Sequence, residues 1–392
     1  MFHLADSDDI KAGKITDVYF ERTVRVLKAK HIDKRVTAEV RARSLPLDYP
    51  WAVLAGLDEV VHLLQGLKID LWGLPEGSFF CPFEPVLFIE GNYRDFACYE
   101  TPLLGLICQA SGVATRAARC KKAAAGKSIV HFGARRMHPG IIPMIDRASF
   151  IGGCDGISVN KSAQDLGEEP IGTIPHALIL LVGDTLEATR MFHEVIEPRV
   201  KRIALIDTLA DEKFEALRVA EGLGKDLFGV RLDTPPSRRG DFLKLLEEVR
   251  WELNLRGFKE VKLLVSGGID EKKILELRGV VDSFGVGTWI SNAPVIDFSL
   301  DIVEIEGKPF SKKGKRSGKK QVWQCSSCYA RLILSAEETA EKCNCGGELV
   351  PLLKPIIKEG KLIKDLPYPK EIREYVLGQL QKIPSGLEEP KD

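Results

Sequence analysis

The feature that most constrains the fold is a regular alternation of short apolar runs with charged, helix-compatible segments between residues 127 and 288. In chain order the apolar runs read SIVHF, CDGISV, GTIPHAL, KRIALID, LFGVRLD, VKLLVSG and VDSFGVG. Most are separated by segments such as DEKFEALRVAEGL, which are typical of surface helices. These seven strand–helix units predict a parallel sheet, and their number favours an α/β barrel, complete or incomplete, over an open doubly wound sheet.

The sequence before this alternation has a different character. Strand-like runs lie at residues 23–32, 36–45 and 85–93. The stretch 51–67 has apolar residues at helical spacing, so residues 1–110 predict an α+β domain. A segment rich in small residues and leucine, 102–126, predicts a long helix that ends at a glycine and leads into the barrel domain, residues 111–295.

Residues 296–392 form a carboxyl-terminal extension in which the strand–helix alternation stops. Its stretch 307–321 has seven Lys or Arg residues and no acid, and we interpret it as a solvated connector. Over the whole chain, 56 basic residues balance 56 acidic ones, so no overall field draws the protein to nucleic acid or to a membrane surface. Neither a membrane-spanning run nor a signal peptide is evident, and we expect a cytoplasmic location.

Cysteines supply the sharpest local motif. Nine are present, an odd number in a long chain, which argues against a secreted disulfide framework. Two close pairs, Cys325 with Cys328 and Cys343 with Cys345, have the spacing of thiolates that chelate one metal ion. We predict a structural Zn²⁺ site in a small ribbon or knuckle at about residues 322–350, and treat the other five cysteines as buried thiols.

In an α/β barrel the catalytic groups come from the carboxyl ends of the strands, and nearly every predicted strand here ends in reactive residues. The candidates are His131, Asp155, His176, Asp207, Arg231, Asp233, Ser266, Gly267, Gly268, Gly285, Gly287 and Thr288. The glycine turns after the last two strands can cradle a phosphate on backbone N–H groups. Arg135 and Arg136 add two permanently charged groups suited to phosphate or carboxylate oxygens, although a surface ion pair is the alternative.

Several of these residues have a structural alternative. His176 lies in an apolar run, where a histidine is as readily a hydrogen-bonded core residue as a functional group. Asp207 and Asp233 can act on a metal through water, on ribose hydroxyls or as charge stabilisers, or can cap the next helix. His131 and Phe132 alternate, so one faces the barrel interior and the other the helices.

Three segments in order, DVYFERT at 17–23, YETPL at 99–103 and FGARR at 132–136, resemble the nicotinate phosphoribosyltransferases and their nicotinamide and quinolinate relatives. The resemblance covers residues 10 to about 295. It implies an irregular, incomplete parallel α/β barrel, an amino-terminal α/β sandwich and a homo-oligomer built from dimers. In each dimer the Tyr19 segment would reach into the neighbour's site.

The same resemblance implies a role for each matched residue. Tyr19 and Phe132 would sandwich the pyridine ring, and Arg231 would meet its carboxylate or carbonyl. Phosphate would be held by Arg135 and by the turns at Gly267, Gly268, Gly285 and Gly287. Asp207 and Asp233 would address the ribose and the diphosphate with its Mg²⁺. His176 matches the family's phosphorylated histidine, which couples ATP hydrolysis to product formation.

The expected function is therefore ATP-coupled formation of nicotinate mononucleotide from nicotinate and phosphoribosyl diphosphate, for NAD biosynthesis. Asp155 falls where a small polar residue suits an acid-specific enzyme, because a carboxylate there repels nicotinate and accepts an amide N–H. Nicotinamide or quinolinate is thus the alternative substrate. From a different class, a zinc-ribbon nucleic-acid-binding protein would explain the basic stretch but leaves the reactive strand ends without a role.

Overall fold

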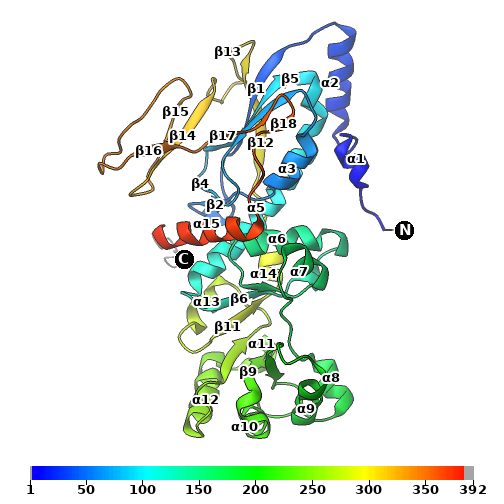
Figure 1. The fold of residues 1–392 in the computed structure, drawn as a ribbon, viewed down its shortest axis with the longest axis vertical. Helices are drawn as coiled ribbons and strands as arrows, with labels where there is room; N and C mark the ends of the chain where they lie inside the picture. Colours follow the sequence, from blue (N-terminus) through cyan, green and yellow to red (C-terminus); the bar gives the residue numbers. More distant parts are fainter. Residues whose placement is uncertain (1, 384–392) are drawn as a thin grey trace. The chain divides into compact units, whose positions relative to one another are not determined.

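The computed structural model describes residues 2–383, so the end of the predicted extension 296–392, from residue 384 on, lies outside the described residues. The chain divides into two compact units (Figure 1). The barrel unit is Arg116–Ala293, and the two-segment unit comprises the chain up to Thr115 together with the chain from Pro294 onward. The extension therefore joins the amino-terminal segment and does not form a separate third domain.

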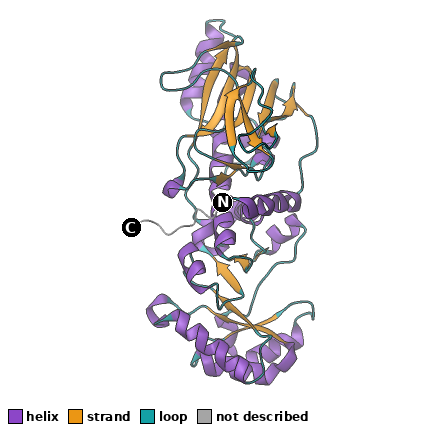
Figure 2. Cartoon of the chain, turned by 90° about the vertical axis from the view of Figure 1, so that its left-hand side faces the viewer, coloured by secondary structure: helices purple, strands orange, loops and turns teal. Residues whose placement is uncertain are grey.

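The two-segment unit is built on a seven-stranded antiparallel sheet with the order β13-β12-β1-β5-β3-β17-β18. Its strands stand side by side at the top of Figure 2. They are β1 (Arg35–Ala42), β3 (Ile69–Gly73), β5 (Pro85–Asn92), β12 (Phe298–Ile305), β13 (Lys308–Pro309), β17 (Lys354–Lys358) and β18 (Lys361–Leu362). A further hairpin pairs β2 (Ala52–Val53) with β4 (Phe79–Phe80). Because β12 and β17 pair with β1 and β3, the two chain segments share one hydrophobic core.

Helices of this unit are α1 (Ser7–Lys11), α2 (Val18–Ala29), α3 (Leu57–Leu64), α4 (Tyr93–Phe96), α15 (Pro369–Lys382) and the short 3-10 turns η1 (Pro46–Asp48) and η2 (Ala97–Tyr99). The long helix α5 (Glu100–Ala123) confirms the helix predicted at 102–126, and the boundary between the units falls within it. The strand predicted at 23–32 is wrong, because most of it belongs to α2. Its alternating valines mimic a strand, but the segment lies between charged helix formers and follows Asp17, which occupies the N-cap position of α2. No helix within residues 2–383 is long and apolar enough to cross a membrane.

The cysteine module forms a three-stranded antiparallel sheet of β15 (Arg331–Ser335), β14 (Lys320–Cys325) and β16 (Leu349–Pro351), in that order. The basic stretch before it is not a solvated connector, because four of its lysines pair with acids of the seven-stranded sheet. Lys312 and Lys315 each lie 2.5 Å from an oxygen of Asp301. Lys320 contacts Glu39 at 2.6 Å, and Lys319 contacts Glu90. These pairs neutralise much of the charge that a nucleic-acid interface needs.

The barrel unit contains a six-stranded parallel sheet with the order β7-β6-β11-β10-β9-β8. The strands are β6 (Ser128–His131), β7 (Gly156–Ile157), β8 (Arg202–Leu205), β9 (Leu227–Leu232), β10 (Lys262–Val265) and β11 (Ser283–Val286). Since β7 and β8 are edge strands that do not pair with each other, the sheet stays open as a half-barrel. The prediction of an incomplete parallel α/β barrel is confirmed.

Helices alternate with these strands: α6 (Ile142–Ile151), α7 (Asn160–Leu166), α8 (His176–Val182), α9 (Thr185–Val195), α10 (Glu212–Leu223), α11 (Pro236–Arg239), α12 (Phe242–Leu255), α13 (Glu271–Leu277) and α14 (Thr288–Ser291). Short 3-10 turns are η3 (Ala134–Arg136), η4 (Pro139–Ile141) and η5 (Gly224–Asp226). The third predicted strand, GTIPHAL, is wrong: residues 172–175 have no regular structure and His176 begins α8. Pro175 has no N–H to donate to a ladder and takes the cap position of α8 instead.

Candidate active site

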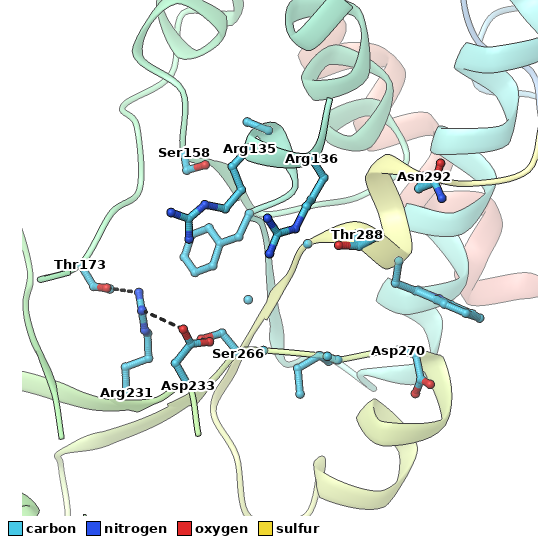
Figure 3. A pocket seen from close by; sticks show the side chains of 18 of the residues that line it. Arg135, Arg136, Ser158, Thr173, Arg231, Asp233, Ser266, Asp270, Thr288 and Asn292 are labelled. Carbon is cyan, nitrogen blue, oxygen red and sulfur yellow. Dashed lines mark hydrogen bonds and ion pairs between the residues drawn. The ribbon is translucent and has the colours of Figure 1, made fainter. Parts of the chain in front are cut away.

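A cavity of about 780 Å³ lies at the carboxyl edge of the parallel sheet, and all the residues that line it belong to the barrel unit (Figure 3). The predicted site residues among them are Phe132, Arg135, Arg231, Asp233, Ser266, Gly267, Gly268, Gly285, Gly287 and Thr288. They come from the ends of β6, β9, β10 and β11, which parallel pairing brings to one edge. Parallel pairing therefore brings these ten predicted residues together around one cavity.

Phe132 follows β6 and forms one wall. Its backbone N–H donates to the carbonyl of Val286 at 2.8 Å, which extends the strand pairing by one residue. A Cβ atom on Gly285 would lie 2.5 Å from Cδ2 of Phe132, so the ring lies directly over this glycine. The preceding residue, His131, points the other way and is fully buried, with Nδ1 2.7 Å from Oδ1 of Asp146. Phe132 is thus the member of the pair that faces the interior.

Arg231, at the end of β9, marks one end of the cavity. One of its terminal nitrogens, Nη1, donates to the hydroxyl of Thr173, and Nη2 lies 3.7 Å from a carboxylate oxygen of Asp233 (Figure 3). Burial lowers the pKa of Arg231, and the nearby Asp233 and Asp207 oppose this effect. The guanidinium remains charged at any physiological pH and lies 5.9 Å from the ring centroid of Phe132. A flat ring that carries an anionic group fits this corner.

Behind Arg231, two acids converge on His176. Ser266 donates its hydroxyl to Oδ1 of Asp233 at 2.8 Å, and the backbone N–H of Asp233 donates to Oδ2 of Asp207 at 2.6 Å. Nε2 of His176 lies 3.8 Å from Asp233 and 4.0 Å from Asp207, while its Nδ1 is 2.9 Å from the hydroxyl of Thr208. His176 and Asp207 are not among the lining residues, but both contact Asp233, which is.

Two consecutive glycines follow β10 and shape the opposite wall. Gly267 and Gly268 have φ angles of +78° and +65°, a backbone conformation that other residues rarely adopt. Arg239 supports the turn by donating from Nη2 to the carbonyl of Ser266 at 3.0 Å and also to that of Gly267. Glycine turns of this kind can present backbone N–H groups to an anion.

Arginines dominate the charge of the cavity lining. Its charged members are Arg116, Arg135, Arg136, Arg231, Asp233 and Asp270. Arg135 and Arg136 are exposed and extend side by side into the cavity from η3 (Figure 3). Because cations outnumber acids around a site with glycine turns, this cavity suits a ligand with several negative charges.

Asp155 does not belong to this site, and its predicted position beside the ligand is wrong. It precedes β7, at the amino end of that strand. Its Oδ2 accepts hydrogen bonds from Lys121 at 2.6 Å and from the backbone N–H of Ile129 at 2.8 Å. The carboxyl end of β7 leads instead to Ser158, which lines the cavity. The strand predicted at CDGISV is confirmed, but Asp155 lies at its amino end and Ser158 at its carboxyl end.

Sequence reasoning also missed Arg116, Thr173, Trp289 and Asn292, which line the cavity. The Arg116 guanidinium lies 3.7 Å from the Trp289 ring centroid and donates to the Trp289 carbonyl at 3.2 Å. Arg116 lies within α5, where one of two arginines gives no signal of function. Ser158 could have been found, because the carboxyl-end rule points to it directly. Tyr19, the predicted partner of Phe132, lies on α2 of the two-segment unit and is 56% exposed.

The four cysteines of the predicted metal site come together. The Sγ atoms of Cys325, Cys328, Cys343 and Cys345 all lie within 4.8 Å of one another. Backbone N–H groups of Ser327 and Cys328 approach Sγ of Cys325 at 3.4 Å, an arrangement that favours a thiolate. A Cβ on Gly347 would lie 2.7 Å from the same sulfur, so glycine gives the cluster room. Four converging thiols fit a tetrahedral Zn²⁺ ion whose coordination the protein fills completely.

An open parallel half-barrel with arginines and glycine turns at the carboxyl edge defines a class of enzyme that binds phosphate-bearing substrates. Family models for the N-terminal and C-terminal domains of quinolinate phosphoribosyl transferase match residues 17–111 and 113–301. The chain belongs to this family.

Individual relatives cover nearly the whole chain. Nicotinate phosphoribosyltransferase pncB2 of Mycobacterium tuberculosis is 27% identical over 96% of this chain and 89% of its own length. A crystal structure of nicotinate-nucleotide pyrophosphorylase from Pyrococcus furiosus is 55% identical, with a TM-score of 0.95 over 97% of this chain and 98% of that one. The structure of human nicotinic acid phosphoribosyltransferase, 21% identical, has a TM-score of 0.75 over 94% of each chain and shares the fold.

Proposed function

We propose that the protein is a nicotinate phosphoribosyltransferase, which forms nicotinate mononucleotide and diphosphate from nicotinate and phosphoribosyl diphosphate. The observation that carries this proposal is the corner formed by Phe132 and Arg231, with glycine turns and further arginines in the same cavity. The ring of nicotinate would stack on Phe132 with its carboxylate toward Arg231. Relatives named for nicotinate, or for its nucleotide, support the assignment.

The chemistry asks for positioning and charge stabilisation. The pyridine nitrogen attacks C1 of the ribose as the C1–O bond to diphosphate breaks, and the ribosyl centre gains cationic character, as in glycoside cleavage. No strong base is required, because the pyridine nitrogen already has a free electron pair. Phe132 would fix the direction of attack, and the arginines with the Gly267–Gly268 turn would hold the phosphates.

Mg²⁺ is part of this proposal as the partner of the diphosphate. Asp233 offers a partly exposed carboxylate beside the cavity, and Asp207 holds its backbone in place from behind. Carboxylate oxygens suit Mg²⁺, which would neutralise charge on the leaving diphosphate. Asp233 would in addition accept hydrogen bonds from ribose hydroxyls.

We propose that His176 couples ATP hydrolysis to the reaction as a transient phosphohistidine. If Thr208 holds Nδ1, the electron pair of Nε2 remains free between two carboxylates. Nε2 would bond to the γ-phosphorus of ATP as the bond to the ADP oxygen breaks, and water would later hydrolyse the N–P bond. Replacing His176 with Ala should abolish the dependence on ATP; unchanged rate and unchanged ATP dependence would refute this role.

Selectivity for the acid follows from Ser158. A hydroxyl at the end of β7 tolerates a carboxylate on the pyridine, whereas an aspartate there would repel it. Quinolinate is the second candidate, because a second carboxylate calls for further cations and Arg116, Arg135 and Arg136 line the same cavity. Nicotinamide lacks such support.

One assay separates these substrates. The protein is incubated with Mg²⁺, phosphoribosyl diphosphate and nicotinate, nicotinamide or quinolinate, with and without ATP, and mononucleotide is quantified by chromatography. We expect the fastest product formation with nicotinate, further increased by ATP. Product only from quinolinate, with release of CO₂, would establish the second candidate, and product from none of the three would refute the proposal.

We also propose that the enzyme works as a homodimer in the cytoplasm, with Tyr19 completing the site of the neighbouring subunit. Its exposure on α2 leaves the ring free for such a contact. Light scattering should give twice the chain mass. Replacing Tyr19 with Ala should raise the KM for nicotinate without changing that mass, whereas a monomer with full activity would contradict the shared site.

The cysteine cluster is proposed to hold one structural Zn²⁺ ion. Arg331 and Glu84, 2.6 Å apart and largely buried, tie the module to the residue that precedes β5 in the same unit. Mass spectrometry of the native protein should find one zinc per chain, and removal by a chelator should lower the Tm. Absence of zinc from protein purified without chelator would contradict this assignment.

A further inference from the structure

A buried polar pair lies directly behind the wall of the cavity and has no role in the proposed chemistry. His131 and Asp146 are both 0% exposed and are joined by the 2.7 Å contact between Nδ1 and Oδ1. Within residues 2–383, Nε2 of His131 and Oδ2 of Asp146 have no hydrogen-bond partner. Two unsatisfied buried atoms are costly, and an apolar pair would avoid that cost. The position of His131 beside Gly133 suggests a role for this pair.

The imidazole supports the turn that carries the cavity's arginines. His131 ends β6, and Gly133 folds back over the imidazole ring. A Cβ on Gly133 would lie 2.5 Å from Nε2 of His131 and 2.5 Å from Oγ of Ser291. Gly133 is therefore held between the ring and α14. It is also the cap of η3, which carries Arg135 and Arg136.

We propose that His131, oriented by Asp146, is a positioning residue that sets the direction of Phe132 and Arg135 toward the bound substrate. In this account Oδ1 of Asp146 accepts the N–H of Nδ1, which fixes the ring and places the edge that carries Nε2 against Gly133. A ring held in this way determines where η3 begins. The substrate in this inference rests on the proposed function, whereas the positioning of η3 does not.

Two variants separate positioning from simple stability. H131N keeps an N–H close to Asp146 but removes the edge of the ring that supports Gly133. The double substitution H131F/D146L keeps a ring of similar size and removes the buried carboxylate that would otherwise be left unpaired. A displacement of about 1 Å at a reacting group can reduce the rate by ~10²-fold, so we expect H131N to raise the KM for phosphoribosyl diphosphate about tenfold. The double substitution keeps the packing but loses the hydrogen bond that orients the ring, so it should raise this KM by a similar factor.

D282N is the matched control, because Asp282 contacts Arg250 at the amino edge of the same sheet. It should lower the Tm and leave the KM unchanged. If H131N lowers the Tm and leaves the KM unchanged as well, or if H131F/D146L keeps the KM of the wild type, positioning by the oriented ring is refuted.

A crystal structure of H131N gives a readout that does not depend on turnover. Displacement of residues 133–136 relative to α14 supports the inference even if the wild type forms no mononucleotide, a result that would refute only the proposed function. An unchanged turn in H131N would overturn the inference in either case.

Discussion

The two edges of the parallel sheet use the same residue types in opposite ways. At the amino edge, Asp155 contacts Lys121 at 2.6 Å and Asp282 contacts Arg250 at 3.1 Å. Each carboxylate also accepts a backbone N–H from a neighbouring strand, at 2.8 and 2.9 Å respectively. These groups satisfy one another and fasten the strands together, so this edge serves stability.

At the carboxyl edge the balance is different. Four arginines face the cavity with two acids, and Arg135 and Arg136 have no ion-pair partner that the structure records within residues 2–383. Exposed arginines without an ion-pair partner, in a cavity that also has glycine turns, are available to bind an anion. In this unit, a charged residue serves stability where the fold supplies a partner of opposite charge. Where the fold supplies none, the residue is available to a ligand.

The strongest test of this contrast compares Arg231 with Arg250. We expect Arg231→Gln to reduce kcat/KM for nicotinate by ~10²- to 10³-fold, because a buried cation aimed at the substrate is lost. Arg250→Gln should remove an ion pair of similar type and lower the free energy of unfolding by about 1 kcal/mol, with kcat/KM nearly unchanged. Steady-state kinetics and urea unfolding of both variants measure this. Similar kinetic losses in the two variants would break the distinction between the edges.

A second test exchanges charge at the two ends of β7. Ser158→Asp should shift selectivity from nicotinate toward nicotinamide by ~10- to 10²-fold, since the new carboxylate repels the acid and accepts the amide N–H. Asp155→Asn changes charge three residues away at the amino edge and should leave selectivity as it is. Competition between the two pyridines, followed by chromatography, gives the ratio. A shift caused by Asp155→Asn alone would restore that residue to the site.

Glycines allow a similar comparison with smaller effects. A methyl group on Gly285 would lie 2.5 Å from the Phe132 ring, whereas one on Gly229 would lie 2.7 Å from the carbonyl of Lys262. Gly285→Ala should displace the ring and raise the KM for nicotinate by about tenfold. Gly229→Ala should reduce stability by about 1–3 kcal/mol and leave the KM of the folded fraction unchanged. Equal KM values for wild type and Gly285→Ala would show that Phe132 does not contact the pyridine ring of nicotinate.

The smallest predicted effect concerns an acid that belongs to neither edge. Burial, with a further contribution from Asp301, raises the pKa of Glu100 to about 7 from 4.5. The folded state then holds this proton more tightly than the unfolded state, so its stabilising contribution is complete below pH 4.5 and is lost as the pH rises through 7. After allowance for solvent screening, we expect a loss of about 1–2 kcal/mol over this range. Denaturant unfolding of Glu100→Gln should show a flatter pH dependence, and an unchanged slope would contradict the shift.

Much of the barrel unit was predictable because its strands are short, apolar and bounded by turns. The half-barrel and the cavity could be predicted from strand ends such as FGARR and SGG. There, an apolar strand is followed directly by polar or glycine residues that are not needed for core packing. The third predicted strand failed because Pro175 makes its segment unable to complete a ladder. The prediction that Asp155 lies in the site is wrong because this residue precedes its strand, whereas sites in this kind of fold form at the carboxyl ends of the strands.

Other features depend on tertiary contacts that no local pattern encodes. Arg116 is one of several arginines in its region of the chain and reaches the site through its stacking on Trp289. The sequence predicts that the lysines of the basic stretch are solvated. In the structure they pair with Asp301, Glu39 and Glu90, of which Glu39 and Glu90 lie far from them in sequence. Contacts between residues that only folding brings together therefore could not be predicted from the sequence.

The central claim, that the carboxyl edge holds a pyridine nucleotide, is tested most directly by a crystal structure with nicotinate mononucleotide. We predict the ring over Phe132, the carboxylate within hydrogen-bond distance of Arg231 and the phosphate beside the Gly267–Gly268 turn. Nucleotide bound elsewhere, or with its phosphate at Arg231, would contradict the account.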